Sequence, residues 1–163
     1  MAANSYAIGL CTGSFAAAAI STSQTISELI PAALEAVLVS FRTGLVSIEA
    51  RNDIEQTSQG APIWSAIVAL KEQEAIAAVN EFLTEKTGLP IASRPYLSAV
   101  SPGGVTLSGP PSILNELLQR PVFSATKEPL RISVHAPYHA SHIHNSSVVN
   151  AILAGADAHI LTS

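Results

Sequence analysis

A single cysteine lies between two glycines near the start of the chain, in the run Gly9-Leu10-Cys11-Thr12-Gly13. The pattern Gly-x-Cys-x-Gly is the cysteine form of the nucleophile elbow, a sharp turn whose small neighbours let a strand and a helix approach closely. Such a turn would expose the thiol at the start of a helix, where the helix dipole favours the thiolate. The pattern predicts Cys11 as a nucleophile, with the Thr12 backbone N–H placed to help bind an oxyanion.

The same five positions also fit a buried structural cysteine in a glycine-containing turn, so the motif alone leaves both interpretations open. Cys11 is the one cysteine among 163 residues, and it cannot form an internal disulfide. A lone thiol suits a reducing compartment, so a cytoplasmic location is expected.

A thiol nucleophile needs a general base, and histidine is the usual partner. His139 follows a predicted strand in the run His135-Ala136-Pro137-Tyr138-His139-Ala140, and His142 and His144 come soon after. Surface or hydrogen-bonding roles would explain most of these histidines, and a metal site would need several of them to converge with further ligands. We predict that His139 is the base and that no metal is bound.

The elements that must position Cys11 are a strand before it and a helix after it. Residues 6–10 are apolar enough for a short buried strand, and residues 14–20 are rich in alanine, a strong helix former. The run Thr25-Ile26-Ser27-Glu28 reads as a capping box, and apolar residues follow at helical spacing as far as position 41.

Two residues should affect the course of this second helix. Pro31 should bend it or mark its first turn, and Gly44 can end it. Residues 52–61 are polar and rich in turn formers, which predicts a loop before the next element.

The pattern changes after this loop, and the run Pro102-Gly103-Gly104 predicts a hairpin turn. Ser112 is the expected N-cap of a short helix. In order, we predict a strand, a helix, two strands, a helix and a strand over residues 64–70, 71–86, 96–100, 105–108, 113–118 and 130–135. The order β-α-β-β-α-β is the ferredoxin-like arrangement.

The predicted organisation is an α/β chain in three parts. Residues 1–61 form the nucleophile-elbow part of a core, residues 62–135 form the ferredoxin-like subdomain, and residues 136–163 return to the core with His139. One elbow with one or two helices cannot bury a parallel sheet alone, so we expect a piece of a larger α/β domain.

The composition argues against a nucleic-acid partner and against insertion into a membrane. Only 12% of the residues are charged against 48% hydrophobic, the net charge is −4, and the first of eight basic residues is Arg42. A nucleic-acid surface needs clustered basic residues, which are missing. The apolar start lacks the positive residues of a signal peptide, and no uninterrupted apolar run reaches the roughly 18 residues of a membrane span.

Four separated motifs follow one another along the chain: Gly9-Leu10-Cys11-Thr12-Gly13, Arg94-Pro95-Tyr96-Leu97-Ser98-Ala99-Val100-Ser101, Gly104-Val105-Thr106-Leu107-Ser108-Gly109-Pro110-Pro111 and Ala136-Pro137-Tyr138-His139-Ala140. In this order they resemble the starter-unit:ACP transacylase domain of fungal non-reducing polyketide synthases. The resemblance covers about residues 8–144. It implies a variant of the malonyl-CoA:ACP transacylase fold, which is an α/β-hydrolase-like core with a ferredoxin-like insert.

The resemblance also implies the roles of the site residues. Cys11 matches the family's nucleophile and His139 its catalytic histidine. An acyl group would pass from acyl-CoA or a fatty acid synthase carrier to Cys11, and then to the phosphopantetheine thiol of an acyl carrier domain. That carrier domain, a ketosynthase and the other domains of a synthase are the implied partners, and no bound cofactor is implied.

Two departures from the family pattern matter. Malonyl-type relatives carry an arginine for the substrate carboxylate at a position that falls near Ala36 here, and Arg42 lies six residues further on. An acyl group without a carboxylate is therefore expected. The family's first strands and a glutamine-containing oxyanion loop have no counterpart, and residues 151–163 match nothing in it, which predicts a fragment. A thioesterase-like or esterase-like hydrolase using the same Cys11 and His139, and an inactive fragment, are the alternatives.

Overall fold

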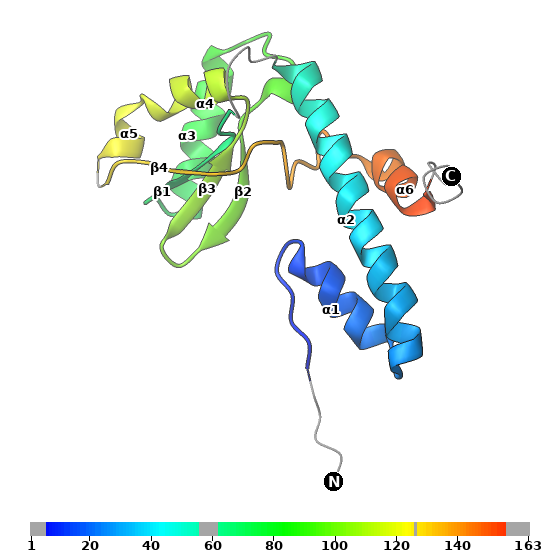
Figure 1. The fold of residues 1–163 in the computed structure, drawn as a ribbon. Helices are drawn as coiled ribbons and strands as arrows, with labels where there is room; N and C mark the ends of the chain where they lie inside the picture. The colour runs from blue at the N-terminus through cyan, green and yellow to red at the C-terminus, as the bar shows by residue number, and fades with distance from the viewer. Residues whose placement is uncertain (1–5, 56–61, 126, 156–163) are drawn as a thin grey trace. The chain divides into compact units, whose positions relative to one another are not determined.

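The computed structural model describes residues 6–55, 62–125 and 127–155, and it divides into two compact units. One unit comprises Met1–Val46 with Ser146–Ser163, and the other comprises Ser47–Asn145. The described residues form a mixed α/β structure with six α-helices and one four-stranded antiparallel sheet, as Figure 1 shows.

The first unit is helical. Its helices are α1 (Gly13–Thr22), the first part of α2 (Ile26–Ile54) and α6 (Ser146–Ala154). One of the two bonds of the predicted capping box is present at the start of α2, where the Glu28 backbone N–H donates to the Thr25 hydroxyl at 3.3 Å. The Glu28 carboxylate accepts from the Gln24 backbone N–H at 2.7 Å, one residue before the predicted N-cap.

Two expectations for this unit are wrong. Residues 6–10 form no strand, and Tyr6, Ile8 and Leu10 are 86%, 95% and 91% exposed. A strand needs a neighbouring strand for its backbone hydrogen bonds, and no described residue supplies one here. Helix α2 does not end at Gly44 but continues to Ile54, because a glycine inside a helix costs only about 1 kcal/mol relative to alanine.

Pro31 lies inside α2, little more than one turn from its start. At that position the proline removes one backbone hydrogen bond near an end where the N–H groups already need other partners. The helix is therefore interrupted neither at Pro31 nor at Gly44, and residues 52–54 of the predicted loop are helical. The rest of that loop, residues 56–61, lies outside the described residues.

Helix α2 is also long and apolar enough to cross a membrane by length and composition alone. The sequence expectation counted uninterrupted apolar runs and so missed a helix in which charges are few but present. This finding is weak support for a membrane span, because the core helix of a soluble protein passes the same test.

The second unit contains the whole of the described sheet. Its elements, in chain order, are β1 (Ser65–Val68), α3 (Glu72–Glu85), η1 (Ile91–Ser93), β2 (Tyr96–Ser101), β3 (Gly104–Ser108), α4 (Pro111–Leu118), α5 (Pro121–Ser124) and β4 (Leu130–Ile132). The strands are ordered β2-β3-β1-β4, and every neighbouring pair is antiparallel. The strands and helices predicted between residues 64 and 135 are present. Most of their ends shift by one or two residues, but β4 ends at Ile132 instead of at residue 135, and α5 was not expected.

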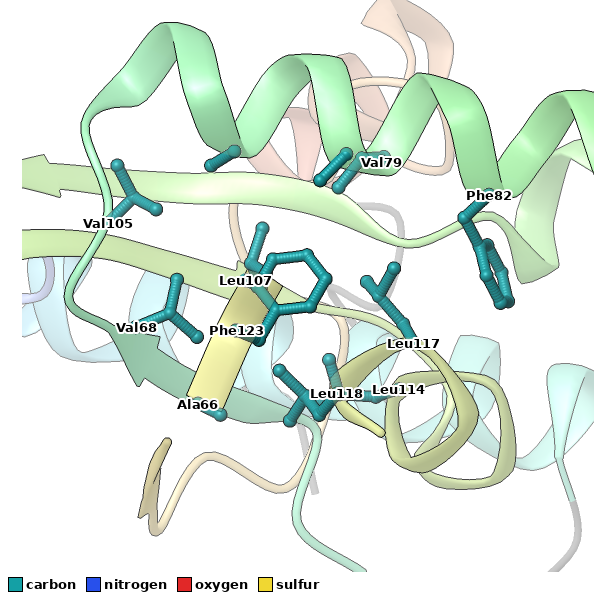
Figure 2. Close-up of a cluster of buried hydrophobic side chains, with 12 residues drawn as sticks. Ala66, Val68, Val79, Phe82, Val105, Leu107, Leu114, Leu117, Leu118 and Phe123 are labelled. Atoms are coloured by element: carbon teal, nitrogen blue, oxygen red, sulfur yellow. The ribbon is translucent and has the colours of Figure 1, made fainter. Parts of the chain in front are cut away.

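The core of the second unit lies between one face of the sheet and its helices. Alternate residues of β1 and β3 point to this face, where they meet apolar side chains of α3, α4 and α5, as Figure 2 shows. The fully buried members include Val68, Val105, Leu107, Leu117 and Phe123. The period-two alternation of these strands therefore leaves Ser65, Thr106 and Ser108 for the opposite face.

The start of α4 differs from the expectation. Ser112 is not the N-cap, because the helix begins at Pro111, whose fixed φ suits the first helical position. Instead, the Glu55 carboxylate accepts hydrogen bonds from the Ser112 backbone N–H at 3.3 Å and from its hydroxyl at 2.9 Å. A carboxylate at this end of a helix interacts favourably with the helix dipole.

Candidate functional site

Cys11 lies in a tight turn that leads directly into α1. The Gly13 backbone N–H donates to the Leu10 carbonyl at 3.0 Å, and the Ser14 backbone N–H donates to the Cys11 carbonyl at the same distance. The Cys11 side chain is exposed, and its φ of 54° is in the left-handed region. The structure thus places the thiol at the surface immediately before the first turn of a helix.

The turn requires glycine at only one of the two glycine positions of the motif. A Cβ atom at Gly9 would lie 2.0 Å from the Gly13 carbonyl oxygen, so only glycine fits there. A Cβ atom at Gly13 would meet nothing within 4 Å. Close approach of the chain on either side of Cys11 therefore depends on Gly9.

The Thr12 backbone N–H is the donor predicted for an oxyanion. The N–H groups of Gly13, Ser14 and Phe15 are all used in bonds within the turn, whereas no described residue accepts a hydrogen bond from the Thr12 N–H. The arrangement therefore leaves one backbone donor beside the thiol that a substrate oxygen could use.

An apolar groove of about 470 Å³ lies between α1 and α2 in the same unit. Thr12 and Phe15 contribute to it from α1 and the residue before it, and Leu29, Ala36 and Ser40 contribute from α2. No charged side chain lines it among the described residues.

Arg42 does not supply a charge to this groove. Its guanidinium forms an ion pair with Glu35, at 3.5 Å, and donates a hydrogen bond to the Ile152 carbonyl at 3.4 Å. Its side chain is only 15% exposed. Both contacts lie within the first unit and hold the guanidinium between α2 and α6.

His139 lies in the second unit, on a segment that follows β4. Its side chain is exposed and its φ is 57°. Short-range bonds fold the backbone around it: the Tyr138 N–H donates to the Ala136 carbonyl at 2.9 Å, and the N–H groups of Ile143 and His144 donate to the Ala140 carbonyl at 2.9 and 2.8 Å. The residue is thus at the apex of a sharp bend.

The neighbouring histidines have identified contacts. His135 Nδ1 lies 3.0 Å from the Pro62 carbonyl oxygen, and His144 Nε2 lies 2.8 Å from the Pro137 carbonyl oxygen. Because a carbonyl oxygen only accepts, each of these nitrogens must carry the proton. His142 packs edge-on against Tyr96 with ring centroids 4.9 Å apart, and its pKa is lowered by burial and by the nearby His144 and Arg94.

Cys11 and His139 share an unusual backbone conformation. Among the described residues other than glycine, they are the two with a positive φ. Such a conformation is disfavoured for residues with a Cβ atom, and it tends to occur where a functional group is held at a special angle. Gly9, Cys11, Thr12 and Gly13 lie in one turn of the first unit, whereas His139 belongs to the second unit.

One residue near His139 was missed by the sequence analysis. Tyr96 begins β2, and its hydroxyl donates to the Tyr138 carbonyl at 2.7 Å. Ser98 and Ser108 lie on the same face of the sheet, and their hydroxyls are 2.7 Å apart. The alternation of Tyr96, Leu97 and Ser98 was a signal that Tyr96 faces away from the core, but nothing in the sequence pointed to its partner.

Among the described residues, no group of three or more histidine, cysteine or acidic side chains could hold a metal ion. The described chain is thus a mixed α/β structure with an exposed thiol in a tight turn at the start of a helix. The family model described as "Starter unit:ACP transacylase in aflatoxin biosynthesis" matches residues 1–139. The chain belongs to this family of acyltransferases.

Curated relatives agree with this assignment. The chain is 44% identical to non-reducing polyketide synthase VdtA of Byssochlamys spectabilis over 153 residues, and 42% identical to the conidial yellow pigment biosynthesis polyketide synthase melA of Penicillium expansum over 147 residues. It is 41% identical to non-reducing polyketide synthase Preu8 of Preussia isomera over 159 residues. These matches cover 90–97% of the chain but only 7% of each relative.

Proposed function

We propose that this chain loads a starter acyl group onto the acyl carrier domain of a polyketide synthase through a thioester on Cys11. One observation carries the proposal: the two residues assigned to the chemistry, Cys11 and His139, are the two described non-glycine residues with a left-handed backbone. The family match supports it, because it includes both residues and ends at His139.

The proposed reaction has two half-reactions. In the first, His139 takes the proton of the Cys11 thiol, and the thiolate attacks the carbonyl carbon of the donor thioester. The Thr12 N–H donates to the oxyanion of the tetrahedral intermediate. When the intermediate collapses, the donor thiolate leaves and takes the proton from His139.

The second half-reaction reverses the order. His139 takes the proton of the incoming phosphopantetheine thiol, whose sulfur attacks the acyl carbon on Cys11. The Cys11 thiolate is the leaving group and recovers the proton from His139. One thioester is broken and one is formed in each half-reaction, so no redox partner and no bound cofactor are needed.

The proposed architecture is part of an α/β-hydrolase-like core with a ferredoxin-like subdomain over residues 62–135. The element order and the sheet order β2-β3-β1-β4 support the ferredoxin-like part. Residues 1–61 and 136–163 would belong to the core. Exposed apolar residues on α2 are spaced by three or four positions and suit a helix that packs on a larger sheet, namely Ile26, Ile30, Leu34, Val37, Phe41, Leu45 and Ile48.

The proposed partners follow from the relatives. The donor would be acyl-CoA or an acyl carrier of a fatty acid synthase, and the acceptor would be the carrier domain of a synthase that also contains a ketosynthase. We propose a soluble, cytoplasmic protein, since the curated relatives are polyketide synthases.

The main competing activity is hydrolysis of the same acyl-enzyme, and a partition experiment separates the two. The chain, loaded with a radiolabelled acetyl group, is mixed with a carrier domain bearing phosphopantetheine. Most of the label is expected on the carrier, because attack by a second thiol conserves the thioester. A carrier domain without the phosphopantetheine is the control and should receive none. Release mainly as free acetate in both samples would instead identify a thioesterase.

The acyl group is expected to be uncharged. A carboxylate that enters a half-buried apolar groove loses hydration, which is unfavourable unless an ion partner is present. Ala36 lines the groove between α1 and α2 and provides none, and Arg42 is engaged by Glu35. Acetyl-CoA and hexanoyl-CoA should therefore be used in preference to malonyl-CoA in a competition assay.

The converse variant is Ala36→Arg, which places a cation in the groove and should raise malonyl loading relative to acetyl loading. Arg42→Gln is the matched control and should leave the preference unchanged. Malonyl transfer at equal or better efficiency by the unmodified chain would show that a carboxylate partner exists elsewhere.

A further inference from the structure

The backbone around His139 is held by side chains from two directions. The Tyr96 hydroxyl, which is 42 residues earlier in the chain, donates to the Tyr138 carbonyl at 2.7 Å. His144 Nε2 donates to the Pro137 carbonyl at 2.8 Å. These two carbonyls belong to the two successive peptide groups that lead into His139, so both bonds restrict the planes of those groups.

Tyr96 is itself held firmly on the sheet. The Ser108 hydroxyl, on the neighbouring strand, forms a hydrogen bond with it. That serine continues into a chain of hydroxyl contacts, to Ser65 on β1 and to Ser98 on β2, each at 2.7 Å. The His142 and Tyr96 rings pack in a T-shaped arrangement. The phenol is therefore held by Ser108 on β3, by the His142 ring and by the carbonyl that it binds, whereas the Ser65 hydroxyl contacts Ser108 instead.

The proton of the Tyr96 hydroxyl is retained under all ordinary conditions. Burial raises the pKa of this phenol well above its usual range, an effect that the Ser108 hydrogen bond only partly offsets. The hydroxyl thus remains a donor, and the Tyr138 carbonyl remains its acceptor.

The conformation of His139 is one that the surroundings must impose. A left-handed backbone is disfavoured for histidine and persists only when the neighbouring structure determines it. The orientation of the Tyr138–His139 peptide group sets φ of His139, and φ sets the direction in which the imidazole leaves the backbone. A contact that fixes the orientation of this peptide group therefore also fixes the direction of the imidazole.

We propose that Tyr96 is a positioning residue of the transacylase: its hydroxyl, fixed on the sheet, orients the Tyr138–His139 peptide group and so aims the His139 imidazole. The proposal rests on the proposed function in that it takes His139 as the general base. Tyr96 does not act on the substrate, and His144 supports the same bend from the other side.

The variant Tyr96→Phe removes the donor and keeps the ring. In the full 163-residue chain, the ¹³Cα and ¹³Cβ chemical shifts of residue 139, which report φ, should move away from their wild-type values. The rate constant for acylation of Cys11 by acetyl-CoA should fall about 10-fold to 100-fold, as expected for a misplaced catalytic group. The KM for acetyl-CoA should change little, because Tyr96 is not proposed to touch it.

Two further variants distinguish a positioning role of Tyr96 from a contribution to the stability of the fold. Ser65→Ala removes a hydroxyl of the same buried chain without touching the bond to Tyr138, so it should lower Tm while leaving the residue 139 shifts and the acylation rate unchanged. Replacing Tyr96 with 4-aminophenylalanine restores an N–H donor, and it should recover most of the rate that Tyr96→Phe loses. Each protein is assayed well below its own Tm.

The outcomes for Tyr96 and for the proposed function are distinct. Unchanged residue 139 shifts in Tyr96→Phe, or an equal loss of rate in Ser65→Ala, would overturn the positioning role whatever the chemistry. If His139→Ala acylates as fast as the wild-type chain, the proposed function is what fails, and the chemical shifts still decide whether Tyr96 orients the bend.

Discussion

Replacing Cys11 with alanine is expected to abolish acylation of the chain by a short acyl-CoA. The thiol is exposed, lies in a left-handed turn before α1, and has the Thr12 N–H beside it. Loss of the nucleophile leaves no group that can form the covalent intermediate, so the rate should fall by more than about 10⁴-fold, as it does for nucleophiles of catalytic triads. Intact-mass spectrometry after incubation with acetyl-CoA measures the effect.

The residue that carries the acyl group can be identified directly in this chain. Cys11 is its one cysteine, so any acyl group released by neutral hydroxylamine as a thioester must have been attached there. Cys11→Ser is the matched control: it keeps the turn and an oxygen nucleophile, and it should be acylated slowly to an ester that resists hydroxylamine. Acylation of Cys11→Ala at the wild-type rate would show that the label lies on another residue.

The second unit was predicted well because its signals are local. The short apolar runs of β1 and β3 mark them as strands, and Pro102-Gly103-Gly104 marks the turn between β2 and β3. Glycine is required at position 104, where φ is 141° and a Cβ atom would lie 2.2 Å from the Val68 carbonyl oxygen. Short-range pattern and turn chemistry determine these elements.

The errors arose where the partner of a segment decides its structure. Residues 6–10 have the composition of a buried strand, but a strand depends on neighbours that the described residues do not provide. Ser112 was predicted as an N-cap from its neighbours, yet the cap interaction comes from Glu55, the residue after α2. Helix α2 passes through Gly44, since propensity is a weak guide to the ends of a long helix.

In the candidate site, too, one part could be predicted from the sequence and the other could not. The tight turn at Cys11 follows from five adjacent residues, and the contact between Gly9 and Gly13 could be expected from their spacing. The bend at His139 could not, because the Tyr96 hydroxyl that holds it comes from a strand 42 residues away. A motif predicts which residue types are present, whereas the angle at which a side chain is held depends on contacts between distant segments.

Replacing His139 with alanine is expected to slow acyl transfer by about 10²-fold to 10⁴-fold, the usual contribution of a general base. Measuring the acetylation rate of Cys11 in the variant and in the wild-type chain gives the size of the effect. A similar loss of rate together with a lowered Tm would point to a structural defect instead.

The other histidines supply the controls, and His135 is the strongest competitor among them. Its Nδ1 donates to the Pro62 carbonyl, which is how many catalytic histidines are oriented, so its Nε2 could in principle accept a proton. His142 packs against Tyr96, and His144 uses Nε2 to hold the Pro137 carbonyl. His135 nevertheless lacks the exposed position and the left-handed backbone that distinguish His139. His135→Gln and His142→Ala should therefore each retain most of the rate, and a greater loss in either of them than in His139→Ala would move the assignment of the base to that residue.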